Sequence, residues 1–449
     1  MSFDIGRIDT GSWAEGGLAA FCFLEGRMKV LFLILILFSS VGASEISHGP
    51  MLGAVSEESA HIWVRTAEAA SVVFTVREQD GQMEVANQTL KTEAHSDFTC
   101  IAKIEGLKKD TAYSYDVAVG DQRFEASFTT LGPSLKKRPL RLVFGYGYKP
   151  GDKMKDPESI FLKMKERKGD FVLFLGDFPY TKAGRRTEVW QENKVIRDNI
   201  GFTPLTSGTS TYAIWDDHDF GPNDCDGTHE YAEEALHGFL DYWPNGSYGL
   251  PNTKGIFRSF VIGDVEVFLL DGRYHARQSK ENPTMLGQVQ LQWLREGLKN
   301  SQARYKLLVS GTPFARVKRD CWGGSFYRAE RDALFRYIVE EDIQGVLGIS
   351  GDIHRCDIHK MPLGKGRFFY DFTGGSLART HRQPPDPWDD RLLYSYGKPE
   401  KNMFAEIDFY PADSTGAAVV LRSFSGASGL THQLKLTPQD LGIKTHTDD

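Results

Sequence analysis

The stretch that decides the fold is Thr211-Tyr-Ala-Ile-Trp-Asp-Asp-His-Asp-Phe-Gly-Pro-Asn-Asp224, where a short apolar run ends in acids around a histidine. Carboxylates packed this closely repel one another unless positive charge lies among them, and a hard metal cation is the usual source of that charge. Two other stretches also run from apolar residues to Gly-Asp with a possible ligand just beyond: Phe171-Val-Leu-Phe-Leu-Gly-Asp-Phe-Pro-Tyr180 and Gly345-Val-Leu-Gly-Ile-Ser-Gly-Asp-Ile-His354. The sequence therefore places function at three strand ends.

The elements around these stretches predict an α/β architecture. Residues 140–144 read as a buried strand, residues 157–168 as a helix and residues 171–175 as the next strand, which together resemble a βαβ unit. Ligands of open α/β sheets bind outside the carboxyl ends of the strands. We therefore expect the three acidic strand ends to meet in one crevice.

The first part of the chain follows a different pattern. Short strands of alternating apolar and polar residues repeat between turn signals, which is typical of a small β-sandwich. No metal-ligand cluster occurs among them. The expected organisation, from the N-terminus, is an upstream extension at 1–27, a signal peptide at 28–43, the sandwich at 44–131, a linker at 132–139 and the catalytic domain at 140–440.

The N-terminus indicates export. Met28-Lys29 precedes an apolar run at 30–38 and small residues that end at Ala43, the three parts of a secretory signal. We expect a periplasmic or secreted protein with no stable membrane anchor after signal removal; a retained anchor is the alternative, although the run is short for a bilayer span. Residues 1–27 then suggest that translation begins at Met28, with an extension of separate function as the alternative.

The charge and the cysteine count of the chain indicate which partners and disulfides to expect. The net charge of −7 and pI near 6.0 argue against a broad nucleic-acid-binding surface. Processing would remove Cys22, which leaves four cysteines with three possible pairings, among which the sequence does not choose. One disulfide, as in other exported proteins, and free buried thiols are the two alternatives. These four are Cys100, Cys225, Cys321 and Cys356.

The acids and their neighbours suggest a two-metal centre. A carboxylate that ends a strand can bridge two cations, which hold a phosphate and lower the pKa of a bound water. Asp177 is the candidate bridge, and His218 is better placed as proton donor to a leaving alkoxide than as a ligand. The remaining candidate ligands are Tyr180, Asp217, Asp352 and His354. Each residue alone is more often a turn, core or interior side chain, so the prediction depends on their conjunction.

The ordered motifs resemble those of a known family. Gly176-Asp-Phe-Pro-Tyr180, Trp215-Asp-Asp-His-Asp219 and Gly351-Asp-Ile-His354 are similar to motifs of the alkaline phosphatase D (PhoD-like) metallophosphatases. These are relatives of the purple acid phosphatases within the calcineurin-like superfamily. The resemblance extends over nearly all of the mature chain and includes Leu270-Asp-Gly-Arg-Tyr274 and Leu286-Gly-Gln-Val-Gln-Leu-Gln-Trp-Leu294.

The resemblance implies a four-layered α/β/β/α metallophosphoesterase fold after an Ig-like or fibronectin-III-like sandwich. It implies a phosphoric ester hydrolase, a phosphomonoesterase or phosphodiesterase for small phosphate esters, in which a metal-bound hydroxide attacks phosphorus. Asp177 would bridge the metals, with Tyr180 and His354 on one ion and Asp217 and Asp352 on the other.

The resemblance also suggests roles for the neighbouring polar residues. His218 would assist the leaving group, while Asp216 and Asp219 would orient the ligand and the acid. Arg273 is a candidate catalytic phosphate clamp because a guanidinium fork fits phosphate oxygens, with an ordinary salt bridge as the alternative.

One departure from the family concerns the metal. Many members carry Ser-Cys after the first strand of the catalytic domain, whereas Gly147 stands here at the cysteine position. Two divalent or mixed-valence ions are expected, with Ca²⁺, Mg²⁺ or Mn²⁺ favoured by oxygen ligands and Fe³⁺ still possible. Tyr146, Tyr148 or Cys356 could replace the lost ligand, but packing is the more ordinary role for each. The signal also lacks the twin arginines common in the family, so a general secretory route is expected.

Two alternatives stay open at this point. A non-catalytic relative would retain the fold with a degraded metal site, and an altered-ester enzyme would cleave sulfate esters or phospholipids, since an oxyanion clamp does not name the central atom. The persistence of Asp177, Asp217, His218, Asp352 and His354 favours the enzyme.

Overall fold

The computed structural model describes residues 45–79, 83–149, 159–318, 320–378, 389–397, 402–414, 416–426 and 429–444. The predicted upstream extension and signal peptide lie outside these ranges, as does the start of the helix predicted at 157–168. Among the described residues, no helix is long and apolar enough to cross a membrane.

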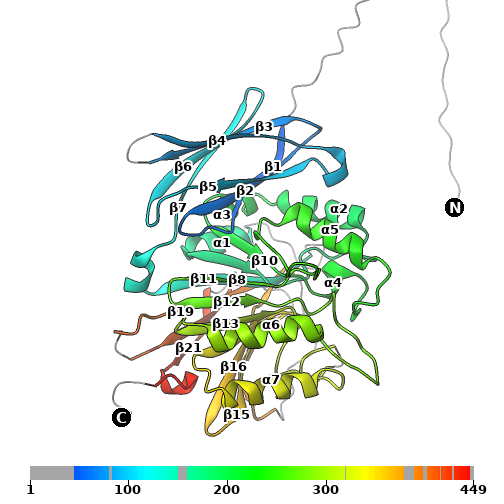
Figure 1. Cartoon of the computed structure of the whole chain (residues 1–449), viewed down its shortest axis with the longest axis vertical. Helices are drawn as coiled ribbons and strands as arrows, with labels where there is room; N and C mark the ends of the chain where they lie inside the picture. The colour runs from blue at the N-terminus through cyan, green and yellow to red at the C-terminus, as the bar shows by residue number, and fades with distance from the viewer. Residues whose placement is uncertain are drawn as a thin grey trace, which may run out of the picture. The chain divides into compact units, whose positions relative to one another are not determined.

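The largest sheet has ten strands in the order β21-β20-β19-β8-β9-β10-β1-β2-β5, and β17 pairs with β8 (Figure 1). Its middle strands β8, β9 and β10 are parallel and fully buried or nearly so, as expected for strands covered on both faces. The bounds are β1 Ile46–Gly53, β2 Ser59–Thr66, β5 Thr99–Glu105, β8 Leu140–Tyr148, β9 Phe171–Phe174, β10 Ser210–Ala213, β17 Ser376–Ala378, β19 Met403–Phe409, β20 Val419–Ser425 and β21 Gly429–Leu436.

A second sheet of seven strands has the order β11-β12-β13-β14-β16-β15-β18, with β12, β13 and β14 parallel. Its apolar side chains join those of the first sheet in one core, where the rings of Phe144 and Phe372 meet edge to face at 5.4 Å. The bounds are β11 Arg258–Ile262, β12 Val265–Leu269, β13 Tyr305–Ser310, β14 Val346–Ser350, β15 Cys356–Gly364, β16 Arg367–Thr373 and β18 Leu392–Tyr396.

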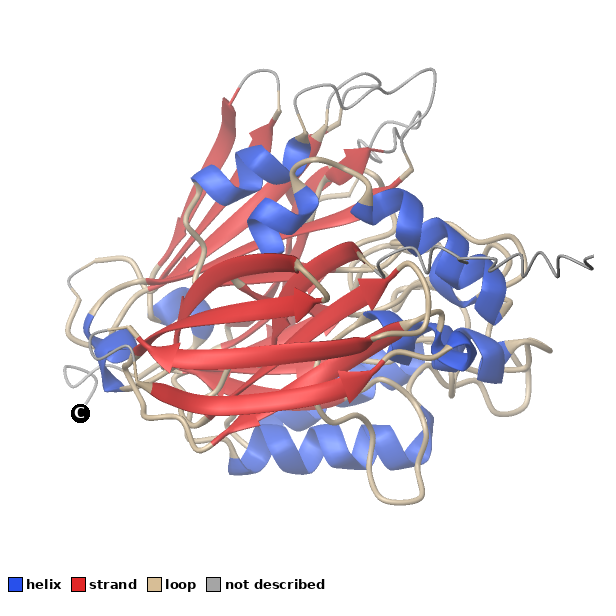
Figure 2. Cartoon of the chain, turned by 90° about the horizontal axis from the view of Figure 1, so that it is seen from above, coloured by secondary structure: helices blue, strands red, loops and turns tan. Residues whose placement is uncertain are grey.

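Helices cover both sheets, and Figure 2 shows helices on both sides of the stacked strands. Phe161 of α1 and Phe202 of α3 pack on Phe174 of β9, while Leu294 of α6 and Leu334 of α7 belong to a separate core with Phe268 of β12. The bounds are α1 Ile160–Glu166, α2 Arg186–Arg197, α3 Phe202–Thr206, α4 Asp217–Phe220, α5 Ala232–Tyr242, α6 Gly287–Asn300 and α7 Arg328–Glu340. Short 3₁₀ helices lie at Ala94–Ser96, Pro133–Lys137 and Gln439–Leu441.

The N-terminal strands form the predicted sandwich-like layer but are not confined to it. A four-stranded sheet, β4-β3-β6-β7, packs its apolar residues against those of β1, β2 and β5. β1 also pairs in parallel with β10, at Gly53 and Thr211, so three of these strands continue the large sheet. The bounds are β3 Ser71–Glu78, β4 Glu84–Lys91, β6 Ala112–Val119 and β7 Gln122–Thr129.

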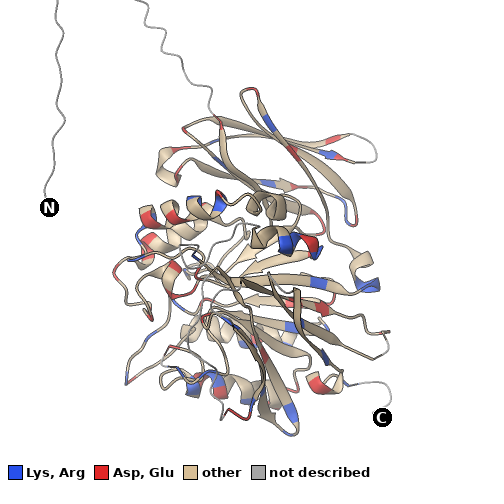
Figure 3. Cartoon of the chain, turned by 180° about the vertical axis from the view of Figure 1, so that it is seen from behind, with Lys and Arg blue, Asp and Glu red and all other residues tan. Residues whose placement is uncertain are grey.

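Lys, Arg, Asp and Glu are distributed over helices and strands of all parts of the described chain (Figure 3). The predicted linker at 132–139 contains a 3₁₀ helix whose Leu135 is buried against the large core. The four cysteines among the described residues are free thiols, so none of them forms a disulfide.

Candidate metal centre

The three acidic stretches converge, as predicted, at the carboxyl ends of strands. Asp177 follows β9 and Asp217 follows its parallel neighbour β10, while Asp352 follows β14 of the second sheet. Asp177, Asp352 and His354 have left-handed backbones, with φ of 49°, 64° and 53°. Such angles cost a residue with a side chain about 1–2 kcal/mol and persist where the surroundings impose them, often at functional sites.

One carboxylate ties two of these turns together. Asp219 accepts hydrogen bonds from the backbone N–H of Phe178 at 3.0 Å and from that of Asp216 at 2.9 Å, so it joins the turn after β9 to the turn after β10. Burial raises the pKa of Asp219 to about 7, although these hydrogen bonds favour its ionised form. Its position agrees with the orienting role predicted from the sequence, which stays a prediction.

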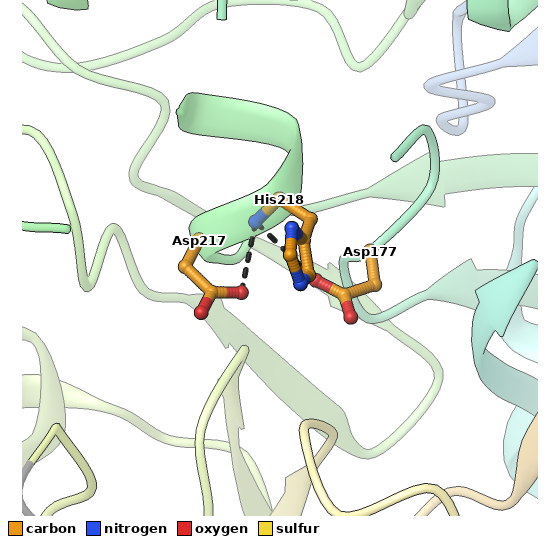
Figure 4. Close-up of side chains that lie close together, drawn as sticks. All are labelled: Asp177, Asp217 and His218. Carbon is orange, nitrogen blue, oxygen red and sulfur yellow. Dashed lines mark hydrogen bonds between the residues drawn. The ribbon is translucent and has the colours of Figure 1, made fainter. Parts of the chain in front are cut away.

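Asp177, Asp217 and His218 form the centre of the site (Figure 4). One ligand atom from each lies within 4.8 Å of the others. The backbone N–H of His218 donates to Asp217 at 2.8 Å and, over a longer 3.4 Å, to Asp177. The first turn of α4 therefore holds two carboxylates on one backbone donor and projects the imidazole beside them.

Tyr180 and His354 approach each other beside His218. The Tyr180 hydroxyl lies 3.4 Å from Nε2 of His354, and the Tyr180 ring lies 4.7 Å from that of His218. A Cβ on Gly147 would stand 3.2 Å from Nδ1 of His354 and 3.3 Å from the Tyr180 hydroxyl. The position where many family members carry cysteine therefore faces this pair.

Asp352 belongs to a neighbouring group that the sequence analysis did not identify. Its carboxylate lies with Asp320 and Cys321, whose sulfur is 3.4 Å from it. Asp320 lies in a second group with Asp217 and Asp224, so it links the Asp217 and Asp352 ends of the site. Asp320 and Cys321 lie in the loop between β13 and α7, well after the strand ends at Ser310, so the pattern of an acid directly after a buried strand does not mark them.

Arg273 has the buried salt-bridge arrangement rather than a free fork. Its guanidinium is 3% exposed and donates through Nε to Asp216 at 2.8 Å, with a second bond from Nη2 to the same oxygen. It also donates to Asp320 at 3.3 Å and to the Cys225 carbonyl at 3.1 Å. Because these partners occupy the guanidinium, the contacts of Arg273 fit the salt-bridge alternative, in which it supports Asp216, better than a phosphate clamp.

The Tyr146 hydroxyl, one of the candidate replacements for the missing cysteine, lies beside the carboxylates of Asp216 and Asp177. Tyr146 is buried, with its hydroxyl 3.3 Å from Asp216 and its ring against Gly351. The Tyr148 hydroxyl accepts a 2.7 Å bond from Asn199, and Cys356 is buried in β15.

The electrostatics of the centre suit a bound cation. Burial and the nearby carboxylates of Asp217 and Asp216 raise the pKa of Asp177 well above its usual value. Burial also disfavours charge on Asp217, but Arg273, His218 and the Asp224 N–H outweigh it and bring its pKa to about 2. A cation between the two would offset both the burial and the repulsion of Asp177. The oxygen, phenol and imidazole donors therefore fit a metal centre with hard ions.

Comparisons with known proteins show which families the chain resembles. A family model described as PhoD-like phosphatase matches residues 202–403, and one described as a domain of unknown function, DUF7800, matches residues 43–130. Alkaline phosphatase D of Bacillus subtilis (strain 168) is 22% identical over 423 residues, covering 74% of this chain and 70% of that protein.

Two solved structures have a similar fold. A structure described as that of PhoD gives a TM-score of 0.72 at 17% identity, covering 89% of this chain and 94% of that one. The purple acid phosphatase PPD1 from yellow lupin (Lupinus luteus) seeds gives 0.61 at 10% identity, covering 89% of this chain and 76% of that one. The mixed α/β architecture is therefore a PhoD-like and purple acid phosphatase-like fold.

We predict that Asp177→Asn weakens metal binding without lowering the stability of the metal-free protein. In metal-free protein at pH 7.5 the substitution should be neutral or stabilising by about 1–3 kcal/mol, because it removes a buried charge and places an amide donor beside Asp217. A carboxyl whose pKa is raised in the folded state lowers stability once the pH exceeds its unfolded pKa, which is near 4. The difference in unfolding free energy between Asp177→Asn and the unaltered protein should therefore shrink toward pH 4.

Thermal unfolding with and without divalent ions measures both effects. Saturating metal at 100 times its Kd should stabilise the unaltered protein by about 2.7 kcal/mol and the variant far less. Asp371→Asn is the matched control, since Asp371 is also buried with a raised pKa but accepts bonds from Ser350 and Ala315 instead. Equal metal stabilisation of Asp177→Asn and the unaltered protein would remove Asp177 from the ligand set.

Proposed function

The chain belongs to the PhoD-like phosphatase family and is a phosphoric ester hydrolase, and from this premise we propose that it cleaves small phosphate esters at a two-metal centre built on Asp177. The observation that carries the proposal is the group of Asp177, Asp217 and His218, whose ligand atoms lie within 4.8 Å of one another. Tyr180 and His354 would hold one ion, Asp217 and Asp352 the other, and Asp177 both. When bound, such ions supply Lewis-acid activation of the ester and of a water molecule.

We propose that the chain's own residues divide the remaining work. His218 protonates the departing oxygen, since its imidazole projects from the start of α4 beside the two carboxylates. Asp217 and Asp177 fix the His218 backbone, while Asp219 and Asp216 hold the turns that carry Asp177 and His218. The acid and the ligands are thus positioned before substrate arrives, which lowers the cost of orienting them in the reaction.

We also propose that the protein is exported through its residues 28–43 and acts in the periplasm or outside the cell, on the basis of the signal-like sequence there. The sheet and helix packing supports the finer proposal of a four-layered α/β/β/α arrangement, and the strands before residue 131 support an Ig-like or fibronectin-III-like layer.

The direct test of the function is metal analysis of the purified protein together with activity after metal removal. We expect two ions per chain, and hydrolysis of p-nitrophenyl phosphate or its bis ester that is lost with chelator and restored by Ca²⁺, Mn²⁺ or Fe³⁺. Inactivity on both esters with every ion would contradict the proposal and favour the non-catalytic alternative.

The role of His218 predicts a dependence on the leaving group. His218→Ala should lower kcat for alkyl phosphates by about 10²- to 10⁴-fold, the usual contribution of general acid catalysis. The loss for p-nitrophenyl phosphate should be much smaller, because a good leaving group departs without a proton. His218→Gln is the matched control for shape and hydrogen bonding. Equal losses on both classes of ester would argue against the acid role.

The space beside Gly147 predicts a change in metal preference. Gly147→Cys places a sulfur next to the Tyr180–His354 pair and should increase Fe³⁺ retention, visible as a tyrosinate-to-iron absorption band. Gly147→Ala adds the same Cβ at the same φ of 64° without the sulfur, so it separates ligation from backbone strain. Identical iron content in the two variants would place the ion away from this position.

A further inference from the structure

The loop between β13 and α7 places two cationic side chains over the Asp352 end of the site. Nζ of Lys318 lies 3.0 Å from Asp224, 3.4 Å from Asp320 and 3.7 Å from Asp352. Arg316 approaches Asp352 at 3.9 Å. Neither cation was singled out from the sequence.

These cations differ from Arg273 in their access to solvent. The side chains of Lys318 and Arg316 are 32% and 24% exposed, whereas that of Arg273 is 3% exposed. The carboxylates beneath them are less accessible, 12% for Asp352 and 0% for Asp320. Lys318 and Arg316 are therefore the solvent-accessible positive charges beside Asp352, while Arg273 stays engaged with Asp216 and Asp320.

The contacts of Lys318 suit an exchange of partners. Three carboxylates share its ammonium, and its distances to Asp320 and Asp352 exceed those of a good charge-assisted hydrogen bond. Lysine carries a point charge on a flexible stem, so Nζ can turn toward a phosphate oxygen while the loop stays in place. Arg316, whose contact with Asp352 is longer still, can do the same.

We propose that Lys318 and Arg316 form a cationic rim that binds the phosphate group of the substrate and makes dianionic phosphomonoesters the preferred class over monoanionic diesters. The proposal rests on the proposed function and deepens it. A phosphomonoester loses its second proton near pH 6 and carries close to two negative charges above pH 7, whereas a diester carries one. Two added positive charges beside Asp352 therefore favour the monoester.

The test compares one monoester with one diester. For the unaltered metal-loaded protein at pH 8, kcat/KM should be higher for p-nitrophenyl phosphate than for bis-p-nitrophenyl phosphate. In Lys318→Met, KM for the monoester should rise about tenfold while KM for the diester changes by less than about threefold, with kcat changed little, because the lost interaction concerns binding. Arg316→Met should act in the same direction, and Lys318→Arg should retain most of the preference.

Inorganic phosphate gives a readout that does not require turnover. Calorimetry on the metal-loaded protein should show about tenfold weaker phosphate binding in Lys318→Met than in the unaltered protein. Lys299→Met is the control, since Lys299 is an exposed lysine of α6 that pairs with Glu341, the residue after α7. Metal content must be measured in each variant, because removing Lys318 leaves three carboxylates without a shared cation.

The outcomes separate this proposal from the proposed function. The proposal of a cationic rim would be wrong if Lys318→Met lowered kcat/KM equally for both esters while phosphate affinity stayed unchanged. It would also be wrong if the loss of activity followed a loss of bound metal. In either case Lys318 would have a structural role. Hydrolysis by the unaltered protein with no preference for the monoester would overturn the rim while the phosphatase stands. If the unaltered protein hydrolyses neither ester, phosphate binding decides the question. Unchanged affinity in Lys318→Met would contradict the rim, and weakened affinity would support it.

Discussion

The site depends on the Asp219 carboxylate, which holds the turns after β9 and β10 together through two backbone N–H groups. Parallel strands bring their carboxyl ends to one edge of a sheet, but they do not fix the direction of the side chains beyond that edge. Asp219 supplies this constraint, and its burial makes the two bonds strong because little water competes for them. The carboxylates of Asp177 and Asp217 lie near each other because these turns do.

The same centre combines groups from both sheets. Asp177 and Asp217 come from the larger sheet, while Asp320 and Asp352 follow strands of the smaller one. Arg273 joins the halves, since its guanidinium bonds Asp216 on one side and Asp320 on the other. Removing either partner of such a buried pair leaves an uncompensated charge, which is far more destabilising than losing a surface ion pair. The contact between the sheets is therefore part of the site's architecture.

The sequence predicted the elements whose hydrophobic pattern is strong and the residues that end them. β9, β10, β14, α6 and α7 were recognisable, and so were Asp177, Asp217 and Asp352 at the strand ends. Helix α2 was not, because its buried face includes the polar side chains of Asn193 and Arg197, which hide the helical period. The parallel pairing of β1 with β10 was also hidden, since long-range pairing leaves no local signal. Lys318 and Asp320 were missed because they lie in an irregular loop, where charge normally indicates solvent exposure.

Gly147 has a consequence for resistance to oxidants. A thiolate ligand can be oxidised by peroxide to sulfenic and then sulfinic acid, and the metal that it holds is then released. The position that faces Tyr180 and His354 has no side chain, so this reaction has no sulfur to attack there. The donors that would hold an ion on that side are a phenol and an imidazole, and these groups do not follow the cysteine oxidation series. Oxidants therefore meet no thiol at this position, whereas Cys321 keeps one beside Asp352 at the other end of the site.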